Sequence, residues 1–527
     1  MATWTGRGAS SRLRGMVLAA LATIFFSGYW LFGAGRNGGL ASPRLDADIG
    51  SSPHSSYDGN SGTSQPPEKV KLPAGEVEPY DPARPPPMYP ELKEAELALP
   101  QHDEDLPSPE GKNARFVRFG NQMWGVGLNN QLFEILLNTE IARRSGRAYV
   151  FTPFIWDPYV GDAYVEINAN DHLAGGKTKQ RAARVPLRAF IDSPTSGAPW
   201  PDGDSPRVPR AVSDAWFDRM CPQEKRVQLD ASKVNPKIGV DFAKDEGIDI
   251  IERWAKLLRE METPCATIQW ETPRIIDFDL MSSDRILSIW PSFSKSPVLT
   301  SFKWSPIVNA AVERNLENLG LYPSTSRIEG ASSRLAGTAA TTPGLVTLHV
   351  RRLDYERHCR WFAGWAEFEG WNKLHFLPDP YVAPSPMVFP LSNGSMPSDF
   401  DFDTNPRAQY LLSRCWLEID AIVQRMLHLK QEYADTMRLD KIYVSTNGRE
   451  EWVEGLKTAL IASGWTTVWT TRDLKLTWEE SGVDSAIDME LATRGELFVG
   501  NGFSTFTSTV VSLRLARGTD PKHIRFW

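Results

Sequence analysis

Hydrophobic and polar positions divide the chain into three stretches of different character. An uninterrupted apolar run covers residues 16–34. Residues 35–112 are rich in Gly, Ser, Pro and acidic side chains and have little apolar periodicity, so this stretch cannot bury enough surface to offset the entropy of ordering it. Beyond it, apolar positions recur at helical and strand spacing. The pattern predicts a disordered stem followed by a folded region that begins near Ala114.

The folded region opens with a helix and a strand. Apolar positions at helical spacing predict a helix over 131–144, and a short apolar run predicts a strand over 148–154. The pattern is mixed as far as residue 335, with further helices expected at 249–262 and 305–319.

A regular alternation of strands and helices follows from residue 344 to the end. Strands are expected at 345–350, 441–445, 466–470 and 497–500, and helices at 409–433, 450–462, 487–494 and 505–517. Such alternation predicts an α/β fold with a parallel, doubly wound sheet. Ligands of these sheets bind beyond the carboxyl ends of the strands.

The apolar run at 16–34 carries no charge and approaches the ~20 residues that span a bilayer. Arginines precede it at positions 7, 12 and 14, whereas only Arg36 follows closely. The positive-inside rule therefore predicts a type II membrane protein, with a cytoplasmic tail at 1–15, a signal anchor at 16–34 and a lumenal remainder. A cleaved signal peptide is the alternative, although its apolar region is typically only ~7–15 residues long.

Export agrees with the cysteine content and with one glycosylation signal. The four cysteines, at positions 221, 265, 359 and 415, could form two disulfides in any of three connectivities. Asn393 begins an Asn-Gly-Ser sequon in a Pro/Ser-rich stretch. Residues 524–527 carry no KDEL-like retention signal, so we expect the Golgi rather than the endoplasmic reticulum.

The charge pattern narrows the class of ligand. A formal net charge of −7 argues against a general nucleic-acid binder, so an anionic ligand would need a local basic site. Two acidic clusters, Asp277 with Asp279 and residues 399–403, imitate the DxD motif that binds Mn²⁺ in some glycosyltransferases. The first does not clearly end a strand and the second lies in a Pro/Ser-rich loop, so we interpret both as solvated acids.

Candidate chemistry lies at two of the predicted strand ends. His349, Arg351 and Arg352 leave the strand at 345–350, and a guanidinium group there can bind a diphosphate bidentately and stabilise it as a leaving group. An Arg–Asp pair with Asp354 is the structural alternative. The hydroxyls and backbone N–H groups of Ser504, Thr505 and Phe506 open a helix, which suits phosphate, although ordinary N-capping explains the same residues.

A glycine-rich turn at 124–131 precedes the first predicted helix. Gly125 and Gly127 would allow a ligand to approach the backbone closely, and Asn129 and Asn130 could orient it by hydrogen bonding. The turn lacks the third glycine of the dinucleotide-binding fingerprint.

Taken together, these three motifs resemble those of the GDP-fucose protein O-fucosyltransferase superfamily and its fungal and plant relatives. The Gly-x-Gly-Leu-Asn-Asn-Gln turn looks like the first motif of that family, the His-Val-Arg-Arg-Leu-Asp segment looks like its His-x-Arg motif, and residues 500–508 look like its C-terminal Ser-Ser-Phe region. Their order and spacing also agree, so the resemblance spans residues 114–527.

The resemblance implies a GT-B-like fold, with two Rossmann-like domains, at 113–335 and 344–527, that face a cleft. It implies inverting, metal-independent transfer of fucose from GDP-fucose to a protein or glycan acceptor, with no cofactor. Arg351 would hold the diphosphate, His349 would support the nucleotide, and Asn129 or Asn130 would position the sugar or acceptor. Ser504, Thr505 and Phe506 would contact the phosphate and nucleotide, and Asp488 would bind guanine or cap a helix.

The chain departs from the family at two positions. Val126 stands where some members have a glutamate that acts as the acceptor base, so the resemblance names no base here. Asn447 stands where relatives often carry aspartate. A transferase-like fold without turnover, acting as a lumenal lectin or scaffold, is the competing class of function, and a metal-dependent glycosyltransferase with another nucleotide sugar is a further alternative.

Overall fold

The computed structural model describes residues 89–123, 126–156, 164–167, 179–201, 208–321, 341–391 and 395–527. The predicted tail, the anchor at 16–34, the stem up to residue 88, Gly125 and Asn393 lie outside these ranges. Within the described part of the chain, no helix is both long and apolar enough to cross a bilayer.

A fully parallel sheet forms the frame of the C-terminal half. Its five strands lie in the order β12-β11-β10-β13-β14. They are β10 (Thr342–Val350), β11 (Lys441–Thr446), β12 (Thr467–Thr470), β13 (Gly495–Gly500) and β14 (Ile524–Phe526). Val346 of β10 pairs with Ile442 of β11 and with Leu497 of β13, and all three side chains are fully buried. The predicted parallel α/β arrangement is confirmed, and β14 extends it beyond the strands expected from the sequence.

A second five-stranded parallel sheet forms the N-terminal half, in the order β7-β2-β1-β9-β8. Its strands are β1 (Phe116–Phe119), β2 (Ala148–Phe151), β7 (Val212–Ser213), β8 (Val227–Leu229) and β9 (Cys265–Ile268). The helix α3 (Leu128–Ser145) connects β1 to β2, close to the bounds expected from the sequence. Two small antiparallel ribbons pair β3 (Phe154–Ile155) with β6 (Arg184–Val185) and β4 (Tyr164–Ile167) with β5 (Lys179–Ala182).

Helices surround both sheets. In the N-terminal half the α-helices are α2 (Tyr89–Leu97), α4 (Leu187–Phe190), α5 (Asp214–Met220), α6 (Ala231–Lys237), α7 (Gly247–Glu260), α8 (Phe278–Met281), α9 (Trp290–Phe293), α10 (Pro297–Thr300) and α11 (Pro306–Asn318). In the C-terminal half they are α12 (Tyr355–Phe362), α13 (Pro406–Cys415), α14 (Ile419–Glu432), α15 (Glu450–Ala462), α16 (Trp478–Ser481), α17 (Asp484–Arg494) and α18 (Thr505–Ala516). Short 3₁₀ turns include η4 (Asp284–Ile289) and η5 (Gly370–Lys373).

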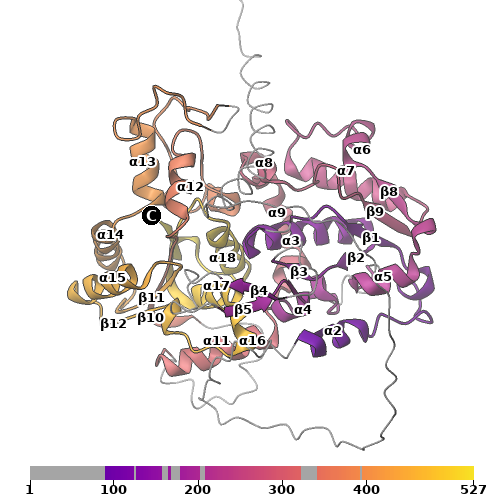
Figure 1. Ribbon diagram of the computed structural model, residues 1–527, viewed down its shortest axis with the longest axis horizontal. Coiled ribbons are helices and arrows are strands. Elements are labelled where there is room, and N and C mark those ends of the chain that lie inside the picture. Colours follow the sequence, from indigo (N-terminus) through magenta and orange to yellow (C-terminus); the bar gives the residue numbers. More distant parts are fainter. Residues whose placement is uncertain are drawn as a thin grey trace, which may run out of the picture.

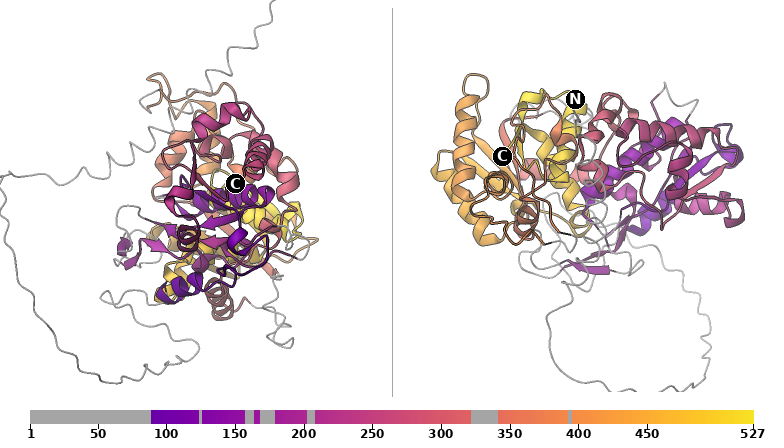
Figure 2. Two further views of the ribbon diagram at one scale, coloured as in Figure 1. Left: turned by 90° about the vertical axis from the view of Figure 1, so that its right-hand side faces the viewer. Right: turned by 90° about the horizontal axis from the view of Figure 1, so that it is seen from above.

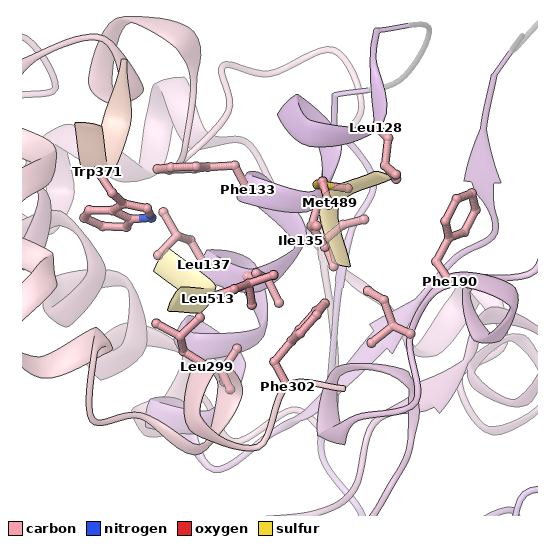
Figure 3. Close-up of a cluster of buried hydrophobic side chains, with 14 of the residues drawn as sticks. Leu128, Phe133, Ile135, Leu137, Phe190, Leu299, Phe302, Trp371, Met489 and Leu513 are labelled. Carbon is pink, nitrogen blue, oxygen red and sulfur yellow. The ribbon is translucent and has the colours of Figure 1, made fainter. Parts of the chain in front are cut away.

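The two halves lie side by side and share one apolar core (Figures 1 and 2). Figure 3 shows Phe133 and Leu137 of α3 in the same buried cluster as Trp371, Met489 and Leu513 of the C-terminal half. The helices that follow β1 and β13, α3 and α18, pack against each other. The last described helix of the N-terminal half, α11, packs on α17. The seam between the halves is therefore a packed interface.

The predicted stem extends too far along the chain, because residues 89–112 belong to the folded region. Tyr89 is buried in the shared core, and the side-chain amide of Gln101 donates to the carbonyls of Gly197 (3.0 Å) and Ala211 (2.6 Å). Glu110 binds the Arg210 guanidinium through both carboxylate oxygens. Polar contacts of this kind leave no apolar periodicity, so the pattern did not reveal them.

The single long helix predicted at 409–433 is also wrong, because α13 ends at Cys415 and α14 begins at Ile419. Tertiary contacts stabilise the segment between α13 and α14. Cys415 is bonded to Cys359, its carbonyl accepts from the Asn501 side chain (2.9 Å), and the Leu417 carbonyl accepts from Arg352 (2.7 Å). Together with the Cys221–Cys265 bond, this confirms the two predicted disulfides and selects one of the three connectivities.

Candidate functional site

The strand order of the C-terminal sheet reverses between β10 and β13, since β11 lies on one side of β10 and β14 on the far side of β13. In open parallel sheets this switch point is where the loops diverge and ligands bind. The loop after β10 carries Arg351 and Arg352, and the loop after β13 leads to Ser504 at the start of α18. Two of the three predicted motifs therefore meet at this switch point.

His349 at the end of β10 joins these two loops. Its Nδ1 lies 2.9 Å from the Thr507 hydroxyl, and its ring stacks on Phe506, with centroids 4.2 Å apart. Burial, together with the nearby Arg351 charge, lowers the pKa of His349 to about 3, so the imidazole is neutral at physiological pH. His349 thus holds the start of α18 against β10, and Phe506 belongs to this stack.

The side chains of the two adjacent arginines, Arg351 and Arg352, lie in different environments. The Arg352 guanidinium lies between the rings of Trp416 and Trp452, 3.8 and 4.2 Å from their centroids, and donates to the Leu417 carbonyl. The Arg351 side chain is 36% exposed, against 8% for Arg352. Its described ionic contact is a long pair with Asp354, at 3.2 and 3.3 Å. We therefore withdraw Arg352 as a ligand-binding residue and keep Arg351.

The turn that separates these arginines from α12 is strained. Leu353 has a φ of +54°, which is uncommon for a bulky side chain. The Asn447 side chain holds the turn by accepting from the backbone N–H of Arg352 at 2.8 Å. Strained residues persist where the surroundings over-determine them, and they cluster at functional sites. Asn447 therefore supports the arginine loop from the end of β11.

The start of α18 is a capped helix N-terminus. Ser504 accepts from the N–H of Phe506 at 3.3 Å, so the capping alternative is correct for its side chain. The first N–H groups of a helix have no acceptor within it, so this end is also suited to an anion. Thr505 is partly exposed there. A Cβ atom on Gly502 would lie 2.2 Å from the Phe368 ring, so the preceding loop requires a glycine.

Asp488 lies deeper than the predicted contact with guanine requires. One of its carboxylate oxygens accepts from the Tyr443 hydroxyl and the other from the Thr471 hydroxyl at 2.8 Å. The side chain is buried at 5% exposure. Thr471 in turn accepts from the backbone N–H of Thr446, at the end of β11. Asp488 therefore orders strand ends, and we give it no ligand contact.

The glycine-rich turn reaches the same seam from the N-terminal half. Gly127 precedes α3 without a side-chain cap, and a Cβ atom there would meet open space. Asn130 is partly buried in the first turn of α3. Asn129 lies one turn before Phe133, which stacks on Trp371, and the Trp371 N–H donates to Ser508 of α18. Asn129 therefore lies on the face of α3 that is directed towards α18.

Several buried polar atoms of the described residues around this region are left unsatisfied, among them Asn129 Oδ1, Asn372 Oδ1 and Ser445 Oγ. Among the residues that the structure describes, the Oδ1 atom of Asn129 is buried and has no hydrogen-bond partner. An unpaired buried acceptor costs about 1–3 kcal/mol, so such groups usually serve a ligand or a water. Asn129 shares this state with other buried atoms, so its role in positioning a substrate stays a prediction.

Glu369 is a residue of the site that the sequence did not reveal. Its N–H donates to the Gly502 carbonyl (2.8 Å), and its carboxylate accepts from the Ser282 hydroxyl of the N-terminal half at 2.9 and 3.1 Å. Burial raises its pKa to about 7 against the opposing effects of Lys373 and Ser282. An isolated glutamate in a Trp-rich segment carries no motif that could have identified it.

The first acidic cluster is not solvated as expected. Asp277 caps α8 by accepting from the Leu280 N–H at 2.9 Å, and burial together with Asp279 raises its pKa to about 7. Burial also raises the pKa of Asp279. By contrast, Asp401 and Asp403 lie on an exposed loop. In the described part of the chain, no three acidic, His or Cys side chains are grouped to hold a metal ion.

Comparisons with known proteins give structural matches only. Neither protein-family models nor curated proteins match the chain. A crystal structure of POFUT1 in complex with GDP-fucose is 13% identical and covers 79% of this chain and 98% of its own, with a TM-score of 0.43. The fucosyltransferase NodZ from Bradyrhizobium is 11% identical and covers 76% and 93%, with a TM-score of 0.32. At this level of similarity, function must be inferred from the residues of this chain.

The fold and the position of the site define the structural class of the protein. The chain is an α/β protein with two parallel sheets, and its candidate site lies at the switch point of the C-terminal sheet, against the first helix of the N-terminal half.

Proposed function

We propose that this chain is a glycosyltransferase of the GT-B type that transfers fucose from GDP-fucose to a hydroxyl group of a protein or glycan, with inversion and without a metal. The observation that carries the proposal is the partly exposed Arg351 guanidinium at the switch point, beside a helix N-terminus. Both features suit a diphosphate. The resemblance of the three motifs to fucosyltransferases favours guanine and fucose as the remaining parts of the donor.

Each site residue has a defined task in this proposal. Arg351 binds the diphosphate and stabilises the charge that develops as GDP leaves, which replaces the metal ion of other transferases. The N-terminus of α18, apart from the Phe506 N–H that Ser504 caps, adds neutral donors to the same phosphates. His349 stays neutral and holds α18 in place through Thr507. Asn129 offers an unpaired amide oxygen to a sugar or acceptor hydroxyl.

The location of the protein is part of the same proposal. A signal anchor at 16–34 would hold the folded region in the lumen of the Golgi, where the two disulfides are stable. Lumenal exposure would also permit glycosylation at Asn393.

Binding of nucleotides to the full-length chain tests the proposed function. The chain is purified in detergent, and titration calorimetry with GDP, GDP-fucose and UDP-sugars is carried out in EDTA. We expect GDP to bind, and the Arg351→Ala variant to bind it at least about tenfold more weakly, since a hydrogen bond to a charged group contributes about 1.5–3 kcal/mol.

Two other outcomes would contradict the proposal. Binding of a UDP-sugar that requires Mn²⁺ would indicate a metal-dependent transferase. Binding of GDP-fucose without any release of GDP would indicate a lectin-like or scaffold protein.

A further inference from the structure

We infer that Glu369 is the catalytic base that deprotonates the acceptor hydroxyl. This inference rests on the proposed function and adds to it the group that the sequence motifs do not supply. Val126 occupies the motif position where a glutamate would stand, and its described contacts are with the apolar core and, through its carbonyl, with the Gln131 amide.

Glu369 lies beside the loop that leads into α18. The segment of Glu369 wraps around the loop between β13 and α18. Glu369 donates its N–H to the Gly502 carbonyl, and the Asn372 side chain donates to the carbonyls of Gly502 (2.9 Å) and Ser504 (3.2 Å). Tyr355, which lies under the Arg351 guanidinium, donates its hydroxyl to the Phe503 carbonyl. Glu369 and Arg351 therefore border the same short loop.

The Glu369 carboxylate contacts a residue of the other half of the molecule. Ser282 follows α8 in the N-terminal half, whereas Glu369 belongs to the C-terminal half. The carboxylate therefore lies on the seam, where an acceptor would meet a donor bound at the switch point. The Ser282 hydroxyl contributes one proton and lies within 3.1 Å of both carboxylate oxygens. A carboxylate has about four acceptor sites, so capacity remains for a substrate hydroxyl.

The charged groups around Glu369 leave its carboxylate able to take up a proton. Lys373 pairs with Asp284 at 3.0 Å and also donates to the Ser282 carbonyl, so its charge is shared and does not neutralise Glu369 alone. A further titratable neighbour is Tyr355, whose pKa is raised by burial and by Glu369. The pKa of Glu369, near 7, agrees with the value that suits a general base at physiological pH.

The step balances without any further reactant. The Glu369 carboxylate takes the proton of the acceptor hydroxyl while the acceptor oxygen forms a bond to C1 of fucose. The bond between C1 and the β-phosphate oxygen breaks, and its electron pair leaves with GDP, whose charge Arg351 stabilises. The protonated Glu369 then returns the proton to solvent.

A structural role is the alternative, because the contact between Ser282 and Glu369 also joins the two halves. Glu369→Gln separates the two roles, since glutamine keeps an oxygen that accepts from Ser282 but cannot take a proton. Glu367→Gln is the matched control, because Glu367 is a partly buried carboxylate two residues away.

The test measures GDP release from GDP-fucose with water as the acceptor, using the full-length chain. We expect Glu369→Gln to lower kcat about 10²–10⁴-fold, as for the loss of a general base, and to leave the Kd of GDP within about twofold. Glu367→Gln should match the wild type. Sodium azide, a nucleophile with no proton to remove, should restore turnover in Glu369→Gln and yield fucosyl azide.

The pH dependence provides a second test that does not need this variant to fold. The wild-type rate should rise with pH through a limb near pH 7 as Glu369 ionises. The Ser282 hydroxyl lowers the pKa of Glu369, so Ser282→Ala should move that limb to higher pH.

The outcomes separate this inference from the proposed function. Glu369 is not the base if the kcat of Glu369→Gln is within about twofold of the wild-type value, or if the variant is inactive and azide does not restore turnover. Either result leaves the proposed transferase activity unaffected. An unmoved pH limb in Ser282→Ala counts against Glu369 in the same way. If the wild type binds GDP but releases none from GDP-fucose, both the proposed transferase activity and the proposed base are contradicted.

Discussion

The two halves of the molecule stabilise the amino ends of their sheets in the same way. Arg147 of the N-terminal half is fully buried and donates to the carbonyls that surround the starts of β1 and β9, among them Phe116 (3.2 Å) and Pro264 (3.1 Å). Arg514 of the C-terminal half does the same at the starts of β13 and β14, with Gly495 (2.7 Å) and His523 (3.3 Å). Burial lowers the pKa of these guanidinium groups to about 10 and 9.

The carboxyl ends of the sheets differ. The C-terminal half presents the partly exposed Arg351 and the N-terminus of α18. The N-terminal half has carboxyl groups with raised pKa values behind its first loop, including Glu134, at about 8, and Asp277, at about 7. The comparison indicates that a shared frame is maintained at one edge, whereas the chemistry at the other edge is specific to each half. In our proposal the cationic half takes the nucleotide.

The largest expected effect tests the shared frame. Arg147→Met and Arg514→Met each leave several buried carbonyls without a donor, at about 1–3 kcal/mol for each unsatisfied group. We expect either variant to lose at least about 3 kcal/mol in the free energy of unfolding in urea. The exposed Arg219→Met should lose less than about 1 kcal/mol. If only one of the two variants lost little free energy of unfolding, the buried arginines would not stabilise the two halves in the same way.

The next effect separates the two adjacent arginines of the C-terminal half. Arg352→Ala removes a guanidinium group from between two indole rings, which should cost about 2 kcal/mol of stability. GDP affinity should stay within about threefold of the wild type. Arg351→Ala should show the reverse, a clear loss of GDP affinity with little change in urea unfolding. If Arg351→Ala and Arg352→Ala weakened GDP binding equally, Arg352 would also be a ligand-binding residue.

The carboxyl groups of the N-terminal half should be visible in the pH dependence of stability. Burial raises the pKa of Glu134 from 4.5 to about 8, so the folded state holds a proton that the unfolded state has released. The contribution of this group is fully present below pH 4.5 and is lost as pH rises through 8. The wild type should lose up to about 1.4 kcal/mol per pH unit in this window.

Two variants on the same helix sharpen this test. Glu134→Gln should flatten the loss between pH 5 and 8, measured as melting temperature. Burial raises the pKa of Glu140, but the hydrogen bonds of Arg143 and Ser296 and the charges of Arg143 and Arg144 outweigh it, so the pKa is lowered. Its stability contribution is therefore present above the unfolded pKa and is lost as pH falls. Glu140→Gln should be destabilised at neutral pH, and identical pH profiles for the two variants would contradict these assignments.

The smallest effect concerns the ion pair beside the site. Asp354 is exposed and contacts Arg351 at 3.2 Å. Exposed pairs contribute about 0–1 kcal/mol, so Asp354→Asn should change unfolding by less than about 1 kcal/mol. It should also tighten GDP binding by about two- to fivefold, because Arg351 no longer has a competing carboxylate. Weaker GDP binding would show that Asp354 orients Arg351 for its ligand.

Local patterns were sufficient to predict much of the C-terminal half. The apolar run of β10 and the alternation that follows it predicted a parallel sheet, because a strand covered on both faces must be apolar throughout. The same pattern placed Arg351 and Ser504 at strand ends, where parallel topology brings them together. In the N-terminal half α3 was predicted well, but β7 and β8 are only two and three residues long and too short to show a period.

The remaining features of the fold and of the site depend on contacts between residues that are far apart in the sequence. The sequence alone identified the motifs that could hold a diphosphate, since strand ends and helix starts are local features. It could not show that Arg352 lies between Trp416 and Trp452, that residues 89–112 pack on the N-terminal half, or that Glu369 meets Ser282 across the seam. A pKa or the accessibility of a guanidinium depends on the groups that folding brings around it, and those groups are far apart along the chain.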